Sequence, residues 1–122
     1  MADYSYEITG NYELWRTSAH QVTVIPNDGW QDESEIIPAK VVKIAWDEQF
    51  IITEQQLLEQ TSSNNLTDTY GEPSNDFAYW ILDTTLRKVY GPFDNKEELK
   101  MEMEKLNIPT TLKLKDVESY RK

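Results

Sequence analysis

Ser18 and His20 are the two residues whose types and spacing come nearest to a catalytic pair in this chain. In an extended segment they would share one face, because side chains two positions apart point the same way, and the imidazole could then accept the serine proton. The glycine-flanked turn that presents a nucleophilic serine in many hydrolases is missing around Ser18. We therefore assign no catalytic residue, and we rank a hydrolase third, behind two non-enzymatic functions.

Metal and cofactor chemistry is limited by the residues that the chain lacks. It has no cysteine and a single histidine, which excludes cysteine-based zinc sites and the HExxH motif. Oxygen ligands do cluster after the Asn27-Asp28-Gly29 turn, at Asp32, Glu33 and Glu35. Their spacing departs from the calcium loop of an EF-hand, which needs ligands at alternate positions and a glycine at the sixth. Because the four glycines also stand singly, no glycine-rich phosphate loop exists, and we predict no metal site and no cofactor.

Trp30 is the best candidate for a binding residue. It follows a turn and lies in a polar segment where no apolar periodicity requires a tryptophan. Exposed aromatic residues are enriched at binding interfaces, and nearby acids can steer a basic surface towards them. We predict a partner-binding surface with Trp30 as its apolar anchor, flanked by the acids Asp28, Asp32, Glu33 and Glu35.

The net charge of −10 is unevenly distributed along the 122 residues. Residues 1–83 carry −12, with Arg16, Lys40 and Lys43 as their only basic residues, whereas residues 84–122 carry +2. An acidic body repels nucleic acid, so we exclude a nucleic-acid partner and keep a basic protein or a surface ligand as open alternatives. No apolar run approaches the roughly 20 residues that a transmembrane helix needs.

Alternating apolar residues predict a chain of short strands, at residues 4–8, 12–15, 20–25, 41–46, 50–53 and 112–115. Phe77–Tyr90 is predicted to be a hairpin. Its first strand has Phe77, Tyr79 and Ile81 on one face and Trp80 and Leu82 on the other. A strand that is apolar on both faces is typical of the middle of a sheet covered on both sides.

One helix is predicted near residues 95–106, with a cap at Asp94 or Asn95 and an apolar stripe at Leu99, Met103 and Leu106. The expected fold class is α+β, a twisted and mainly antiparallel sheet of about six or seven strands with this C-terminal helix packed on it. The length suits a single domain over residues 1–122. We expect a mobile loop at residues 60–76, which are rich in Ser, Asn, Thr, Gly and Pro, and fraying after Asp116.

Several segments resemble a family of small uncharacterised proteins of Gram-positive bacteria. They are Asp3-Tyr4-Ser5-Tyr6-Glu7, Gly10-Asn11-Tyr12-Glu13-Leu14, Arg16–His20, Ile37–Val42, Phe50-Ile51-Ile52, Tyr79–Asp83 and Lys88–Pro92. Many members look like exported lipoproteins, with a lipidated cysteine just before the first of these segments. This chain has Met1-Ala2 there. The resemblance implies a surface location if a signal and cysteine were removed, and a cytoplasmic one otherwise, and it implies no activity.

These observations favour a non-enzymatic binding or accessory domain, as the soluble part of a cell-surface lipoprotein. The alternative is an acidic immunity-type or inhibitor protein that neutralises a basic partner, which rests on charge and size. The chemistry of the ligand and the oligomeric state stay open at this point.

Overall fold

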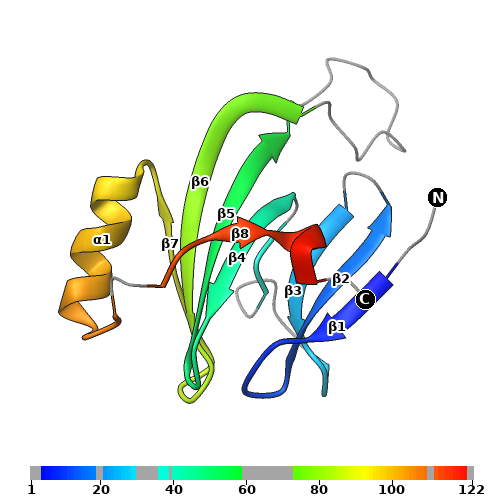
Figure 1. Cartoon of the computed structure of the whole chain (residues 1–122), viewed down its shortest axis with the longest axis horizontal. Helices are drawn as coiled ribbons and strands as arrows, with labels where there is room; N and C mark the ends of the chain where they lie inside the picture. Colours follow the sequence, from blue (N-terminus) through cyan, green and yellow to red (C-terminus); the bar gives the residue numbers. More distant parts are fainter. Residues whose placement is uncertain are drawn as a thin grey trace.

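The described part of the chain is built of eight strands, one α-helix and one short 3-10 helix (Figure 1). The computed structural model describes residues 4–18, 21–29, 36–38, 40–58, 73–109 and 112–120. Helix α1 spans Lys96–Lys105 and the 3-10 helix η2 spans Val117–Tyr120. The strands are β1 (Tyr4–Glu7), β2 (Tyr12–Ser18), β3 (Gln21–Pro26), β4 (Val41–Trp46), β5 (Phe50–Leu58), β6 (Pro73–Asp83), β7 (Lys88–Phe93) and β8 (Lys115–Asp116).

The strands form two sheets. The first contains β1, β2 and β3, and the second contains β7, β6, β5, β4 and β8 in that order, with antiparallel pairing throughout. The mainly antiparallel architecture with one helix is confirmed, but the expected single sheet of six or seven strands is wrong. The division falls between β3, which ends at Pro26, and β4.

The five-stranded sheet lies in the middle of the molecule and is covered on both faces. Helix α1 packs on one face and the three-stranded sheet on the other (Figure 1). The two-sided character of β6 follows from this arrangement. Tyr79 and Ile81 point into the cluster under the helix, whereas Trp80 and Leu82 point into the cluster between the sheets. The prediction that this strand is covered on both faces is confirmed from Tyr79 to Leu82 but is wrong at Phe77, which is 38% exposed.

Both β5 and β6 are longer than the apolar pattern indicated. β5 continues to Leu58, and β6 begins at Pro73, so residues 73–76 belong to a strand and not to the expected mobile loop. The sequence pattern failed because Glu54 and Gln55, though polar, are buried in the sheet opposite Tyr79 and Ala78. Residues 60–72, the rest of that predicted loop, lie outside the described residues.

The helix begins and ends close to the predicted positions. The Asn95 side chain accepts a hydrogen bond from the Glu98 N–H at 2.9 Å, and the Glu98 carboxylate accepts one from the Asp94 N–H at 2.9 Å. These two bonds satisfy N–H groups that a helix start leaves without partners. Leu99 and Met103 are buried against the sheet, which confirms the predicted apolar stripe.

The chain after Asp116 is tied to the core. β8 pairs with β4, and Val117 is 6% exposed in the cluster between the sheets. The carbonyl of Val117 accepts a hydrogen bond from the Tyr6 hydroxyl at 2.8 Å, which joins η2 to β1. Val117 therefore packs in the core, and the expectation of fraying after Asp116 stays a prediction for the exposed residues that follow it.

The two sheets are held together at one end by contacts between turns. The Thr9 hydroxyl in the β1–β2 turn donates to the Glu48 carbonyl of the other sheet at 3.2 Å. Within the five-stranded sheet, the Thr84 hydroxyl donates to the Gln49 carbonyl at 2.6 Å. Gly10 lies so close to Thr84 that a Cβ on the glycine would be 2.3 Å from the Thr84 Cβ. These turns connect β1 to β2, β4 to β5 and β6 to β7, so this end of the molecule is closed.

Candidate functional site

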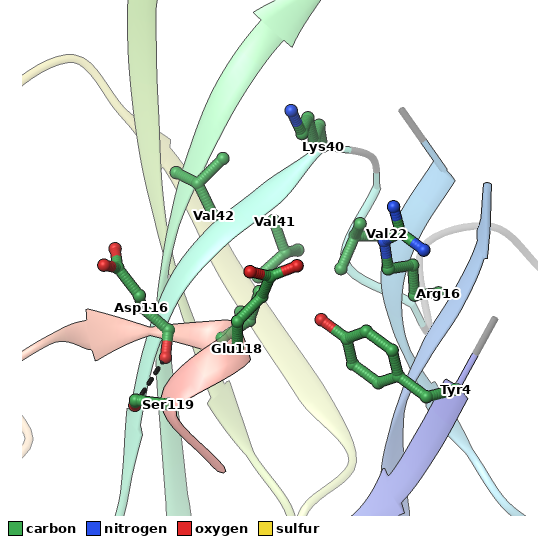
Figure 2. Close-up of a pocket in the computed structure, with 10 residues that line it drawn as sticks. Tyr4, Arg16, Val22, Lys40, Val41, Val42, Asp116, Glu118 and Ser119 are labelled. Atoms are coloured by element: carbon green, nitrogen blue, oxygen red, sulfur yellow. Dashed lines mark hydrogen bonds between the residues drawn. The ribbon is translucent and has the colours of Figure 1, made fainter. Parts of the chain in front are cut away.

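A groove opens between the two sheets at the end opposite those turns (Figure 2). Tyr4 begins β1 and Lys40 immediately precedes β4, so both lie far along their strands from the turns that join the sheets. The cavity has a volume of about 640 Å³. That volume is within the roughly 300–1,000 Å³ that small-ligand pockets span. We call this cavity the inter-sheet groove.

One wall of the inter-sheet groove carries Tyr4 and Arg16, which lie opposite each other in the β1–β2 ladder. The Arg16 guanidinium lies over the Tyr4 ring, 5.6 Å from its centroid. Such a cation–π contact restricts the long arginine side chain. The β1–β2 pairing therefore presents a positive charge beside a phenol at the groove.

Lys40 adds a second positive charge from the five-stranded sheet. Its backbone N–H donates to the Gln56 carbonyl at 3.3 Å, and its carbonyl accepts from the Gln56 N–H at 2.8 Å. These bonds extend the β4–β5 pairing past the start of β4 and fix the Lys40 backbone. Arg16 and Lys40 are thus two of the three basic residues in the acidic segment 1–83, and both line the same groove.

The facing wall is formed by the C-terminal segment and is acidic. Asp116 ends β8 and Glu118 lies in η2, whose first turn is held by a 2.7 Å hydrogen bond from the Ser119 hydroxyl to the Asp116 carbonyl. Figure 2 shows the Glu118 carboxylate and the Tyr4 hydroxyl directed into the cavity from opposite sides. Apolar side chains of the core lie at the base of the groove, namely Val22, Val41 and Val117, and Val42 also lines it.

This arrangement can recognise charge of both signs. A negative group would find Arg16 and Lys40, a positive group would find Glu118, and an apolar portion would lie on the valines. Among the described residues, Lys40, Asp116 and Glu118 form no ion pair with one another or with other side chains within 4.0 Å. The groove therefore has the side chains of a binding site for a dipolar molecule.

The structure describes one of the five residues predicted as a partner-binding surface. Asp28 lies in the turn after β3 with a side chain 59% exposed, and it accepts two hydrogen bonds from Arg87, at 3.0 and 3.2 Å. The hydrogen bond to Asp28 raises the pKa of the Arg87 guanidinium. The surface as a whole stays a prediction, and its other four residues lie outside the described part of the chain: Trp30, Asp32, Glu33 and Glu35.

The remaining residues considered from the sequence are not assembled into a site in the described part of the chain. Ser18 ends β2, whereas His20 lies outside the described residues, so their proposed pairing stays untested. Within the described ranges, no group of three or more Asp, Glu or His side chains is arranged to hold a metal ion. No helix in those ranges has the length and apolar character needed to cross a membrane.

Sequence reasoning missed the inter-sheet groove. Its main cationic residues, Arg16 and Lys40, lie 24 positions apart on different sheets, and Glu118 comes from the far end of the chain. One signal was present in the sequence. Basic residues are so rare in the first 83 positions that Arg16 and Lys40 could have been singled out as candidate binding residues.

The chain belongs to a family described as proteins of unknown function, DUF3997, which matches residues 9–118. This result confirms the expectation of an uncharacterised domain family. No curated protein and no solved structure matches the chain.

Proposed function

We propose that this member of the DUF3997 family is a non-enzymatic binding domain that holds a small zwitterionic ligand, of the size of a short peptide, in the inter-sheet groove. One observation carries the proposal. In a segment with only three basic residues, Arg16 and Lys40 converge from two different sheets on one cavity, and the C-terminal segment directs the carboxylate of Glu118 into it.

The charges suggest how the ligand would be oriented. Its carboxylate would lie between Arg16 and Lys40, and its ammonium group beside Glu118, with the apolar portion on the valine base. Arginine binds a carboxylate well because its planar donors match the two oxygens. Each partly exposed ion pair contributes up to about 1 kcal/mol, so we expect an affinity between about millimolar and micromolar.

The side chains of the groove support binding rather than catalysis. Its described lining contains tyrosine, serine, two cations, two carboxylates and four valines, and no histidine or cysteine that would activate a nucleophile. The Ser119 hydroxyl donates to the backbone carbonyl of Asp116, and this hydrogen bond stabilises η2.

We also propose that residues 1–122 act as one domain and form the soluble part of a cell-surface lipoprotein. The resemblance of the segment around Asp3–Glu7 to exported lipoproteins supports this location. Mass spectrometry of the N-terminal peptide of the natural gene product tests it. A lipidated cysteine just before that segment supports the proposal, and an unmodified N-terminus without one contradicts it.

The alternative is an immunity-type or inhibitor protein that binds a basic partner on the surface around Trp30. The charge of −12 over residues 1–83 favours it. Asp28 would contribute little to such steering because Arg87 already pairs with it. Trp30→Ala should weaken binding in this alternative and leave ligand binding in the inter-sheet groove unchanged.

The test is a panel of free amino acids and dipeptides, screened for those that raise the melting temperature, since a ligand that binds the native state stabilises it. Hits are then titrated calorimetrically against Lys40→Gln and Glu118→Gln. We expect each change to weaken binding about fivefold, as the loss of about 1 kcal/mol would do.

Lys105→Gln is the matched control for Lys40→Gln, because this lysine is exposed on α1 and lies outside the inter-sheet groove. It removes the same charge and should leave the affinity unchanged. Weakening by this control as large as that by Lys40→Gln would show a general effect of net charge and would contradict the assignment of the groove.

A further inference from the structure

A second cavity lies between helix α1 and the helix-facing side of the five-stranded sheet. It has a volume of about 350 Å³ and is bounded by α1, by Lys43 and Ile52 on the sheet, and by the segment Leu112–Leu114. We propose that this cavity, the lysine pocket, binds a single-chain amphiphilic anion, specifically a medium-chain carboxylate. The inference is independent of the inter-sheet groove, which lies on the other face of the same sheet.

The base of the lysine pocket is apolar. Ile52, Leu99 and Met103 are buried there, with exposed fractions of 2%, 5% and 4%. Leu112 and Leu114 are half-buried and form one side. Helix α1 packs mainly on β6 and β7, so part of this apolar surface is left accessible from the side. An alkyl chain would fill the space with favourable contacts.

The rim of the lysine pocket is positively charged in a protein of net charge −10. Lys96, Lys100 and Lys113 line it with exposed side chains, and the described lining contains no acidic residue. Lys96 and Lys100 are four residues apart on α1, an arrangement of like charges that destabilises a helix slightly. An anion bound between them would relieve this repulsion.

These lysines are not neutralised by ion pairs in the described part of the chain. The one ion pair of α1 there joins Lys105 to Glu102 at 3.9 Å and lies away from the pocket. Lys43 also lines the pocket, but its ladder neighbours are Glu54 and Asp116. We therefore assign anion recognition to Lys96, Lys100 and Lys113, and not to Lys43.

Size and charge together select the ligand class. A volume of about 350 Å³ is near the lower limit of small-ligand pockets, which suits one alkyl chain better than a lipid with several chains. The apolar base requires an apolar body, which inorganic anions lack. The lysines require a negative head, which distinguishes a carboxylate from an alcohol of equal length.

The test is a titration with decanoate, below the concentration at which it forms micelles, followed by calorimetry and by the methyl NMR signals of Ile52, Leu99 and Met103. We expect saturable binding that shifts these three signals. Decanol and acetate are the comparison ligands. Both should bind at least about tenfold more weakly than decanoate, because decanol lacks the negative charge and acetate lacks the alkyl chain. Decanol binding as tightly as decanoate would overturn the role of the lysines.

The variant K96Q/K100Q/K113Q should weaken decanoate binding about tenfold, because it removes the three exposed positive charges that attract the carboxylate. The matched control is K88Q/K105Q/K115Q, which has the same net charge and changes lysines outside the pocket. It should bind as the wild type does. Equal loss in both variants, or methyl shifts confined to other parts of the protein, would overturn the proposal.

Discussion

Replacing Gly10 by alanine tests how the two sheets are joined at their closed end. Gly10 lies in the β1–β2 turn with a φ of +60°, a left-handed conformation that costs a residue with a Cβ about 1–3 kcal/mol. The new Cβ would also be 2.3 Å from the Cβ of Thr84. Thr84 is 8% exposed and its hydroxyl is bonded to the Gln49 carbonyl, so it cannot move away cheaply.

Overpacking of this kind costs about another 1–3 kcal/mol. We therefore expect Gly10→Ala to lower the free energy of unfolding by about 2–6 kcal/mol, measured by urea denaturation with circular dichroism. Gly29→Ala is the matched control. Gly29 also has a positive φ, of +93°, but a Cβ added there would have no neighbouring atom within 4 Å, so the control should show the backbone cost alone.

A double-mutant cycle separates the clash from the backbone strain. Thr84→Gly removes the atom that the new Cβ would meet, so Gly10→Ala should cost less in that background than in the wild type. If Gly10→Ala were no more destabilising than Gly29→Ala, or if its cost were the same with and without Thr84, the close packing of the two turns would be refuted.

Two further changes test the central strand β6. Trp80→Ala should lower the free energy of unfolding by about 3 kcal/mol in urea melts, because its ring is partly buried between the sheets and its indole N–H donates to Gln55 at 2.7 Å; a loss below about 1 kcal/mol would contradict this packing. Burial, with a smaller contribution from Glu54, raises the pKa of Tyr79 above its ordinary value of 10.0. The neutral phenol therefore stabilises the fold fully below about pH 10, and this contribution is lost as the pH rises through the higher native pKa. Tyr79→Phe should flatten the alkaline loss of stability in urea melts, and an unchanged pH profile would contradict the assignment.

The elements best predicted from the sequence are those whose signals are local. The helix was found because its cap and its apolar stripe lie within a dozen residues, from Asn95 to Leu106. The two-sided strand Phe77–Leu82 was found because alternation is visible in the strand itself. Local signals do not say which strands pair, however, so the division into two sheets was not predictable from alternation.

The candidate site was less predictable for the same physical reason. The acids around Trp30 attracted attention because they are contiguous in sequence. The inter-sheet groove instead joins Arg16, Lys40 and Glu118, which only the folded chain brings to one cavity. Buried polar residues such as Gln55 likewise broke the apolar pattern, which hid the full length of β5.

The most direct test of the central claim is a two-dimensional NMR titration of the labelled protein with the tightest-binding dipeptide of the panel. We expect saturable shifts in the signals of Tyr4, Arg16, Lys40 and Glu118 and in the methyl groups of Val22 and Val41, with α1 and the turns at the closed end unaffected. Shifts confined to other parts of the protein, or no saturable shift with any zwitterion of the panel, would contradict a binding function of the inter-sheet groove.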